Sequence, residues 1–176
     1  MKDLIFVFDV DSTVITFESL NKIISQNIND KKKSKKLDEI ANKALNGEYD
    51  YHKAFILRFY LTNLIKENFV DENRYIKNNL VEKIKDVFNL LFKEKCEVYL
   101  LSGGFKINID YVAKLLKISN KNVFANDFIE KDGKLVLNDS PLTYVDGKID
   151  ACKEIKKRYK NPFLTMIGDG VTDMNV

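Results

Sequence analysis

Residues 4–13, LIFVFDVDST, decide the fold of this 176-residue chain. Five apolar residues run directly into Asp9 and Asp11. Two further runs have the same form, VYLLSGG at 98–104 and FLTMIGDGVTD at 163–173. Short apolar runs bounded by glycine and acidic residues are typical of buried parallel strands. Because ligands of open α/β sheets bind outside the carboxyl ends of such strands, the three strand ends are predicted to form one site.

The rest of the chain alternates between strand and helix patterns. A hairpin is predicted at 128–136 because Asp132-Gly133 interrupts an alternating apolar pattern. The alternation favours an α/β fold with a doubly wound parallel sheet. The predicted strands are 3–9, 97–101, 122–125 and 163–167, and the predicted helices of this part are 80–92, 105–116 (after a Gly-Gly turn) and 148–159.

Residues 17–75 show only helical periodicity, and this segment is too long to be a simple crossover between two strands. We therefore predict a small all-helical cap at 17–75, inserted after the first strand of a core formed by 1–16 and 76–176. The basic run KKKSKK at 31–36 could contact nucleic acid or a membrane. It lacks interleaved aromatic residues and precedes an amphipathic stretch, so a solvated helix start is the preferred interpretation, with neither partner expected.

Four carboxylates follow the predicted strands, those of Asp9, Asp11, Asp169 and Asp173. Such a cluster is costly without a cation, and Mg²⁺ prefers oxygen ligands of this kind. An Asp can attack phosphorus as a nucleophile, and a second Asp can exchange protons with the leaving oxygen and with water. Asp-x-Asp alone is more often a solvated turn, but hydrophobic residues on both sides make this occurrence more specific.

Ser102, Gly103 and Gly104 could bind an anion, because glycines let backbone N–H groups approach it closely. Lys148 follows Asp146-Gly147 at a predicted helix start and could add its charge to the same anion. Taken alone, the glycines would be a plain turn and Lys148 a surface lysine.

Three motifs resemble those of the haloacid dehalogenase superfamily, in the same order along the chain. They are FDVDSTVI at 8–15, LSGGF at 101–105 and MIGDGVTDM at 166–174. The first motif has Ser12 where a glycine could stand, and in this it resembles the branch of the superfamily that hydrolyses O-phospho-L-serine. The resemblance spans essentially the whole chain and implies a core of the superfamily's type with a cap that selects the substrate.

The resemblance also implies roles for individual residues. Asp9 would be the nucleophile that forms an aspartyl-phosphate, and Asp11 the general acid and base. Mg²⁺ would be held by Asp9, the backbone carbonyl of Asp11 and Asp169, while Asp173 would lie behind these ligands or orient Lys148. The phosphate-binding and substrate-binding residues of the core would be Ser102, Gly103, Gly104, Lys148 and Thr172.

In the cap, the resemblance assigns Glu18 to the substrate amine and Arg58 to its carboxylate. Leu45, Asn46 and Tyr51 would shape the pocket; Asn46 replaces the usual Gly and Tyr51 the usual Phe. Solvated helix charges are the alternative for Glu18 and Arg58.

The leading functional hypothesis is a Mg²⁺-dependent hydrolase that releases L-serine from O-phospho-L-serine, the last step of serine biosynthesis. Alternatives are a phosphatase or phosphotransferase for another small phosphomonoester, or a protein with weak or no activity. The last alternative rests on the end of the chain at Val176, where the family implies further strands, so a fragment with an open sheet edge is one expectation.

Composition adds few restrictions. The net charge is +3, and the sequence contains 45% hydrophobic residues and no run of about 20 apolar residues. Cys96 and Cys152 lack metal-ligand spacing, which favours reduced thiols and a cytoplasmic location. His52 is expected to be a surface or cap residue, and a homodimer is a possible assembly.

Overall fold

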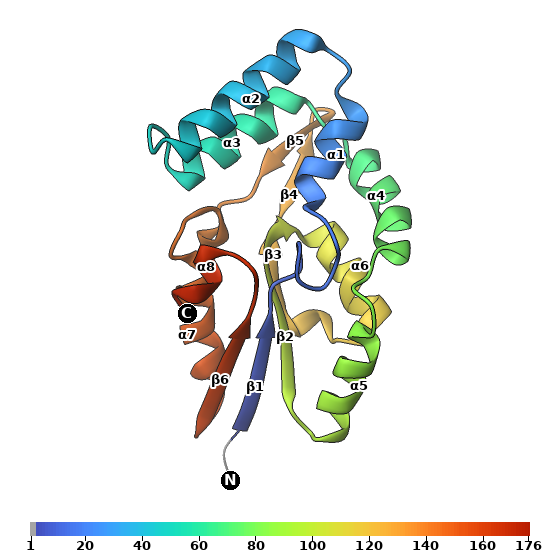
Figure 1. The fold of residues 1–176 in the computed structure, drawn as a ribbon, viewed down its shortest axis with the longest axis vertical. Coiled ribbons are helices and arrows are strands. Elements are labelled where there is room, and N and C mark those ends of the chain that lie inside the picture. The colour runs from blue at the N-terminus through green and yellow to red at the C-terminus, as the bar shows by residue number, and fades with distance from the viewer. Residues whose placement is uncertain (1–2) are drawn as a thin grey trace.

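A computed structural model describes residues 3–176 of the chain. Its centre is a four-stranded parallel sheet with the strand order β3-β2-β1-β6 (Figure 1), which confirms the predicted α/β fold. Phe8, the last residue of β1, pairs with Leu100 on one side and Ile167 on the other, so the carboxyl ends of β1 and β6 coincide. The strands are β1 (Asp3–Phe8), β2 (Glu97–Phe105), β3 (Val123–Asn126) and β6 (Pro162–Ile167).

The sheet is covered on both faces because alternate strand residues point to opposite sides. Phe8 and Leu100 pack against α5 (Ile84–Lys93) and α6 (Lys106–Leu116). Val7 and Leu101 pack on the other face against α7 (Gly147–Lys156). Full burial of one such side chain contributes roughly 1.5–3 kcal/mol, so the two layers fix the strands whose ends carry the site.

Four helices follow β1 directly and lie beyond the carboxyl ends of the strands (Figure 1). Asp30 and Asp50 cap two of them, accepting hydrogen bonds from the backbone N–H groups of Lys32 and Lys53 at 2.8 and 2.7 Å. The basic run at 31–36 is therefore a helix start. The helices are α1 (Ser19–Asn27), α2 (Lys31–Leu45), α3 (Tyr51–Thr62) and α4 (Lys66–Asn78).

The predicted hairpin forms from β4 (Phe128–Lys131) and β5 (Lys134–Leu137). Asp132 and Gly133 have φ values of 52° and 70°, as a two-residue turn of the favoured hairpin type requires. Phe128 of this hairpin packs against Phe69 of α4 and Phe105 of β2, with ring centroids 4.8 and 5.5 Å apart. The hydrophobic cluster under the cap helices thus includes residues outside 17–75, and the division into cap and core stays a prediction.

Two local predictions were wrong. Ser102, Gly103 and Gly104 are not a turn: they belong to β2, which runs to Phe105 with a register shift against β3. The helix expected from residue 80 begins at Ile84, because Leu80 instead forms an antiparallel bridge with Ile15. Three short helices complete the described chain, η1 (Asn120–Asn122), η2 (Pro141–Thr143) and α8 (Val171–Met174).

No helix within residues 3–176 has the length and apolar character needed to cross a bilayer.

Candidate active site

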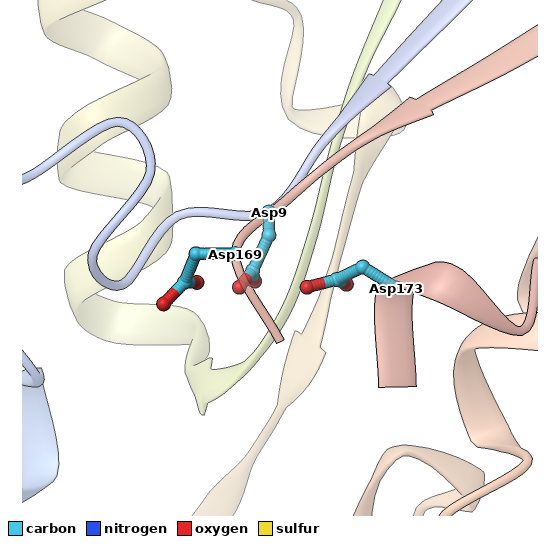
Figure 2. A group of neighbouring side chains, drawn as sticks. All are labelled: Asp9, Asp169 and Asp173. Carbon is cyan, nitrogen blue, oxygen red and sulfur yellow. The ribbon is translucent and has the colours of Figure 1, made fainter. Parts of the chain in front are cut away.

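Three carboxylates meet at the adjoining ends of β1 and β6 (Figure 2). Asp9 directly follows β1, and its backbone N–H donates to the carbonyl of Ile167 at 2.8 Å, which holds it beside β6. Asp169 follows β6, and Asp173 lies on α8. One oxygen from each of the three carboxylates lies within 4.8 Å of the others. Their placement at one strand end agrees with the arrangement expected from the sequence.

Gly168 allows Asp173 to reach this position. A β-carbon at residue 168 would lie 2.3 Å from the Asp173 carboxylate, a distance that real contacts do not reach. The backbone N–H of Gly170 donates to Oδ2 of Asp173 at 3.0 Å. The glycines of the GDG motif therefore place Asp173 as well as Asp169.

Lys148 neutralises part of this charge. It lies at the start of α7, only 8% exposed, with Nζ 2.9 Å from Oδ1 of Asp9 and 2.6 Å from Oδ1 of Asp173. Burial raises the pKa of Asp9 to about 6, against the opposing pull of Lys148. Burial acts to lower the pKa of Lys148, but the Asp9 and Asp173 carboxylates outweigh it and leave that pKa raised.

The donor set suits a hard divalent cation. Lys148 contacts two of the three carboxylates, those of Asp9 and Asp173. The third, that of Asp169, is exposed, and the hydroxyl of Thr13 donates to it at 3.4 Å. Surplus negative charge on oxygen ligands is what such a cation neutralises. Asp9 and Asp169 could present oxygens to such a cation, while one Asp173 oxygen contacts Lys148 and the other Gly170.

Asp11 lies two residues after Asp9, and its Oδ2 accepts hydrogen bonds from both the backbone N–H and the hydroxyl of Ser19, at 3.1 and 2.8 Å. Burial raises the pKa of Asp11 to about 7, which the hydrogen bond from Ser19 counteracts. Ser12 adopts a left-handed φ of 55° and donates through its hydroxyl to Oε1 of Glu18 at 2.6 Å. The loop 11–18 thus folds back and brings the start of α1 to the site.

A cavity of about 350 Å³ lies between these strand ends and the helices α1, α2 and α3. Tyr51 closes part of it: its hydroxyl is 2.9 Å from where a β-carbon at Gly103 would be. The structure brings most of the predicted site residues together here. They are Asp9, Asp11, Glu18, Tyr51, Arg58, Ser102, Gly103, Gly104, Lys148, Asp169, Thr172 and Asp173.

One predicted pocket residue with a described side chain is not found at this cavity. Asn46 is the exposed C-terminal cap of α2 and does not belong to its lining. The side chain of Leu45 falls outside the part of the chain that the structure describes. Ala41 and Ala44 line the cavity from α2 instead. Small residues three apart on one helix face were the available signal, but it is equally typical of ordinary helix packing.

Sequence reasoning also missed the residues that orient the predicted ones. Asn21 accepts a hydrogen bond from Nη2 of Arg58, and Ser19 holds Asp11. Within the β2 segment, the hydroxyl of Ser102 accepts from the backbone N–H of Gly104 at 2.9 Å. The carbonyl of Gly103 accepts from the Asn126 side chain at 2.8 Å. None of these contacts follows from a spacing that could be recognised in advance.

Residues 6–176 match the family of haloacid dehalogenase-like hydrolases, and the chain belongs to this family. Among curated proteins, it is 31% identical over 175 residues to the phosphoserine phosphatase of Drosophila melanogaster, covering 97% of this chain and 63% of that protein. It is 29% identical to the chloroplastic phosphoserine phosphatase of Arabidopsis thaliana, covering 95% of this chain and 56% of the relative. The chain thus spans less than two thirds of the length of these two relatives.

The chain is also similar to a solved structure. A phosphoserine phosphohydrolase-like protein from Francisella tularensis superposes with a TM-score of 0.81 at 29% identity, covering 99% of this chain and 81% of that one.

Proposed function

We propose that this protein hydrolyses phosphomonoesters, with O-phospho-L-serine as substrate, through an aspartyl-phosphate on Asp9. The observation that carries the proposal is the convergence of Asp9, Asp11 and Lys148 on one cavity that Glu18 and Arg58 also line. Family membership supports the hydrolase chemistry, and the names of the relatives support the substrate.

In the first half of the reaction, a carboxylate oxygen of Asp9 attacks phosphorus, and the bond from phosphorus to the serine oxygen breaks. Asp11, in its protonated form, gives its proton to that oxygen as L-serine leaves. In the second half, the Asp11 carboxylate takes a proton from water, the water oxygen attacks phosphorus, and the bond to Asp9 breaks. A pKa of about 7 lets Asp11 populate both protonation states near neutral pH.

The phosphoryl group would be held by Ser102 and Lys148. Lys148 carries the charge that a phosphoryl group attracts, and the fully buried Ser102 hydroxyl lies on the same cavity. The residues that would hold Mg²⁺ are Asp9, Asp169 and the Asp11 backbone carbonyl, with Asp173 behind them. When bound, the ion would offset repulsion between the Asp9 carboxylate and the anionic substrate.

Glu18 and Arg58 would recognise the two charges of the amino acid. The Arg58 guanidinium is half-buried at the cavity, where its fork of donors suits a carboxylate. Glu18 provides a carboxylate for the substrate amine, held in place by the hydroxyl of Ser12. The presence of two opposite charges at one cavity favours a zwitterionic substrate over a simple alkyl phosphate.

The deciding experiment measures phosphate release from O-phospho-L-serine with Mg²⁺ and with a chelator. We expect Mg²⁺-dependent turnover, which Asp9→Asn abolishes because the substitution keeps the shape and removes the nucleophile. Adding a competing alcohol and analysing the products separates hydrolysis from phosphoryl transfer. Substantial steady-state turnover by the Asp9→Asn variant would overturn the aspartyl-phosphate mechanism.

A further inference from the structure

Ser19 is buried at the start of α1, with an exposed fraction of 2%. It directs two donors, its backbone N–H and its hydroxyl, at the same oxygen of Asp11, Oδ2. The other oxygen, Oδ1, is buried and has no hydrogen-bond partner anywhere in the described chain. The two oxygens of this carboxylate are therefore unequal, since one is anchored twice and the other is free.

The two hydrogen bonds to Asp11 come from the helical block after β1. Asp11 leaves the sheet in the loop after β1, where the chain has no regular ladder to orient a side chain. Ser19 is the first residue of the first cap helix, so its N–H is among those that the helix itself leaves unpaired. Partial positive charge at a helix start favours a carboxylate there.

We propose that Ser19 is the positioning residue for Asp11, fixing Oδ2 so that Oδ1 presents the proton to the leaving oxygen of the substrate. The inference rests on the proposed function for the identity of the reaction. It adds that the acid is aimed by a residue of the cap helix and not by the core from which Asp11 itself comes.

A positioning role predicts a dependence on the leaving group. An alkoxide such as that of serine must be protonated as it departs, whereas p-nitrophenolate departs without help. Ser19→Ala should therefore lower kcat/KM for O-phospho-L-serine by about ten- to a hundredfold. The value for p-nitrophenyl phosphate should stay close to wild type. A general loss of folding would lower kcat/KM for both substrates together.

Two further variants separate the hydrogen bond from packing. Ser19→Cys keeps nearly the same volume but is a weak donor, so it should behave like Ser19→Ala. Ser25→Ala removes an exposed hydroxyl from the same helix, which donates to the carbonyl of Lys22 at 2.8 Å. This variant should leave kcat/KM unchanged for both substrates. In an Asp11→Asn background, Ser19→Ala should cause no further loss with O-phospho-L-serine, because Ser19 acts through Asp11.

The inference is overturned if Ser19→Ala lowers kcat/KM equally for both substrates, if Ser19→Cys restores wild-type values, or if the loss persists in the Asp11→Asn background. A crystal structure of Ser19→Ala provides a readout without turnover, and we expect the Asp11 side chain to leave its present orientation. An unchanged orientation would also overturn the inference. Absence of activity in the wild-type protein would instead count against the proposed function, leaving the crystallographic comparison to judge Ser19.

Discussion

The ammonium group of Lys148 lies 2.9 Å from the carboxylate of Asp9 and so joins the start of α7 to the residue that follows β1. The same ammonium reaches Asp173 at 2.6 Å. All three residues are less than a tenth exposed. Removing one partner of such a group leaves buried charge without compensation, which is far more harmful than losing an exposed ion pair.

Lys148→Gln should therefore lower the free energy of unfolding by about 3–5 kcal/mol in metal-free buffer, measured by urea denaturation. Lys153→Gln is the matched control on the same helix: its 3.0 Å pair with Asp150 is 64% and 63% exposed. We expect that variant to lose less than about 1 kcal/mol. Similar losses in the two variants would show that burial of the Lys148 cluster has little effect on stability.

Arg58→Ala should reduce kcat/KM for O-phospho-L-serine by about ten- to a hundredfold, because a charged hydrogen-bond partner of the substrate carboxylate is lost. p-Nitrophenyl phosphate has no carboxylate and should be affected much less. Arg74→Ala, in which an 89% exposed arginine of α4 is removed, serves as the control. Equal losses on both substrates would mean that Arg58 is structural and that the amino-acid assignment fails.

Gly103→Ala should disturb the cap side of the cavity, because the new β-carbon would lie 2.9 Å from the hydroxyl of Tyr51. We expect KM for O-phospho-L-serine to rise by about tenfold. Tyr51→Phe removes the colliding oxygen, so the double variant should recover much of the loss. If Tyr51→Phe gives no recovery, the defect of Gly103→Ala arises in β2 and not from the contact with the cap.

Glu72 gives a prediction about pH. It is buried in α4 with an exposed fraction of 1%, and neither carboxylate oxygen has a partner among residues 3–176. Burial raises its pKa from 4.5 to about 7, while Lys22 acts in the opposite direction. Between these two values the folded protein binds more protons than the unfolded chain, so this residue's contribution to stability falls as pH rises from about 4.5 to 7.

Glu72→Gln cannot ionise and should escape this loss. Relative to the variant, wild type should become less stable by about 1–3 kcal/mol between pH 5 and pH 8, measured by denaturation at both values. Glu67→Gln, an exposed position on the same helix, should show no comparable shift. A difference between wild type and Glu72→Gln that does not vary with pH would contradict the prediction.

The features that depend on local pattern could be predicted from the sequence. The apolar runs before Asp9 and Asp169 predicted the strands, and Asp132-Gly133 predicted the hairpin turn, because period and turn chemistry are local properties. The turn expected at Ser102–Gly104 was wrong for a non-local reason: Leu101 and Phe105, on either side of the two glycines, both pair with β3 and keep this segment in the strand. Contacts such as Arg58 with Asn21 or Asp11 with Ser19 depend on how the loop after β1 returns, which tertiary packing decides.

The packing of Phe128 and Phe105 against the cap helices bears on attempts to alter specificity by recombination. Exchanging residues 17–75 alone with those of another protein would place a different hydrophobic face on the aromatic rings that contact Phe59 and Phe69. A better unit of exchange is discontinuous: it comprises the helical block together with the hairpin at 128–137, so that Phe128 moves with the helices while Phe105 remains in β2.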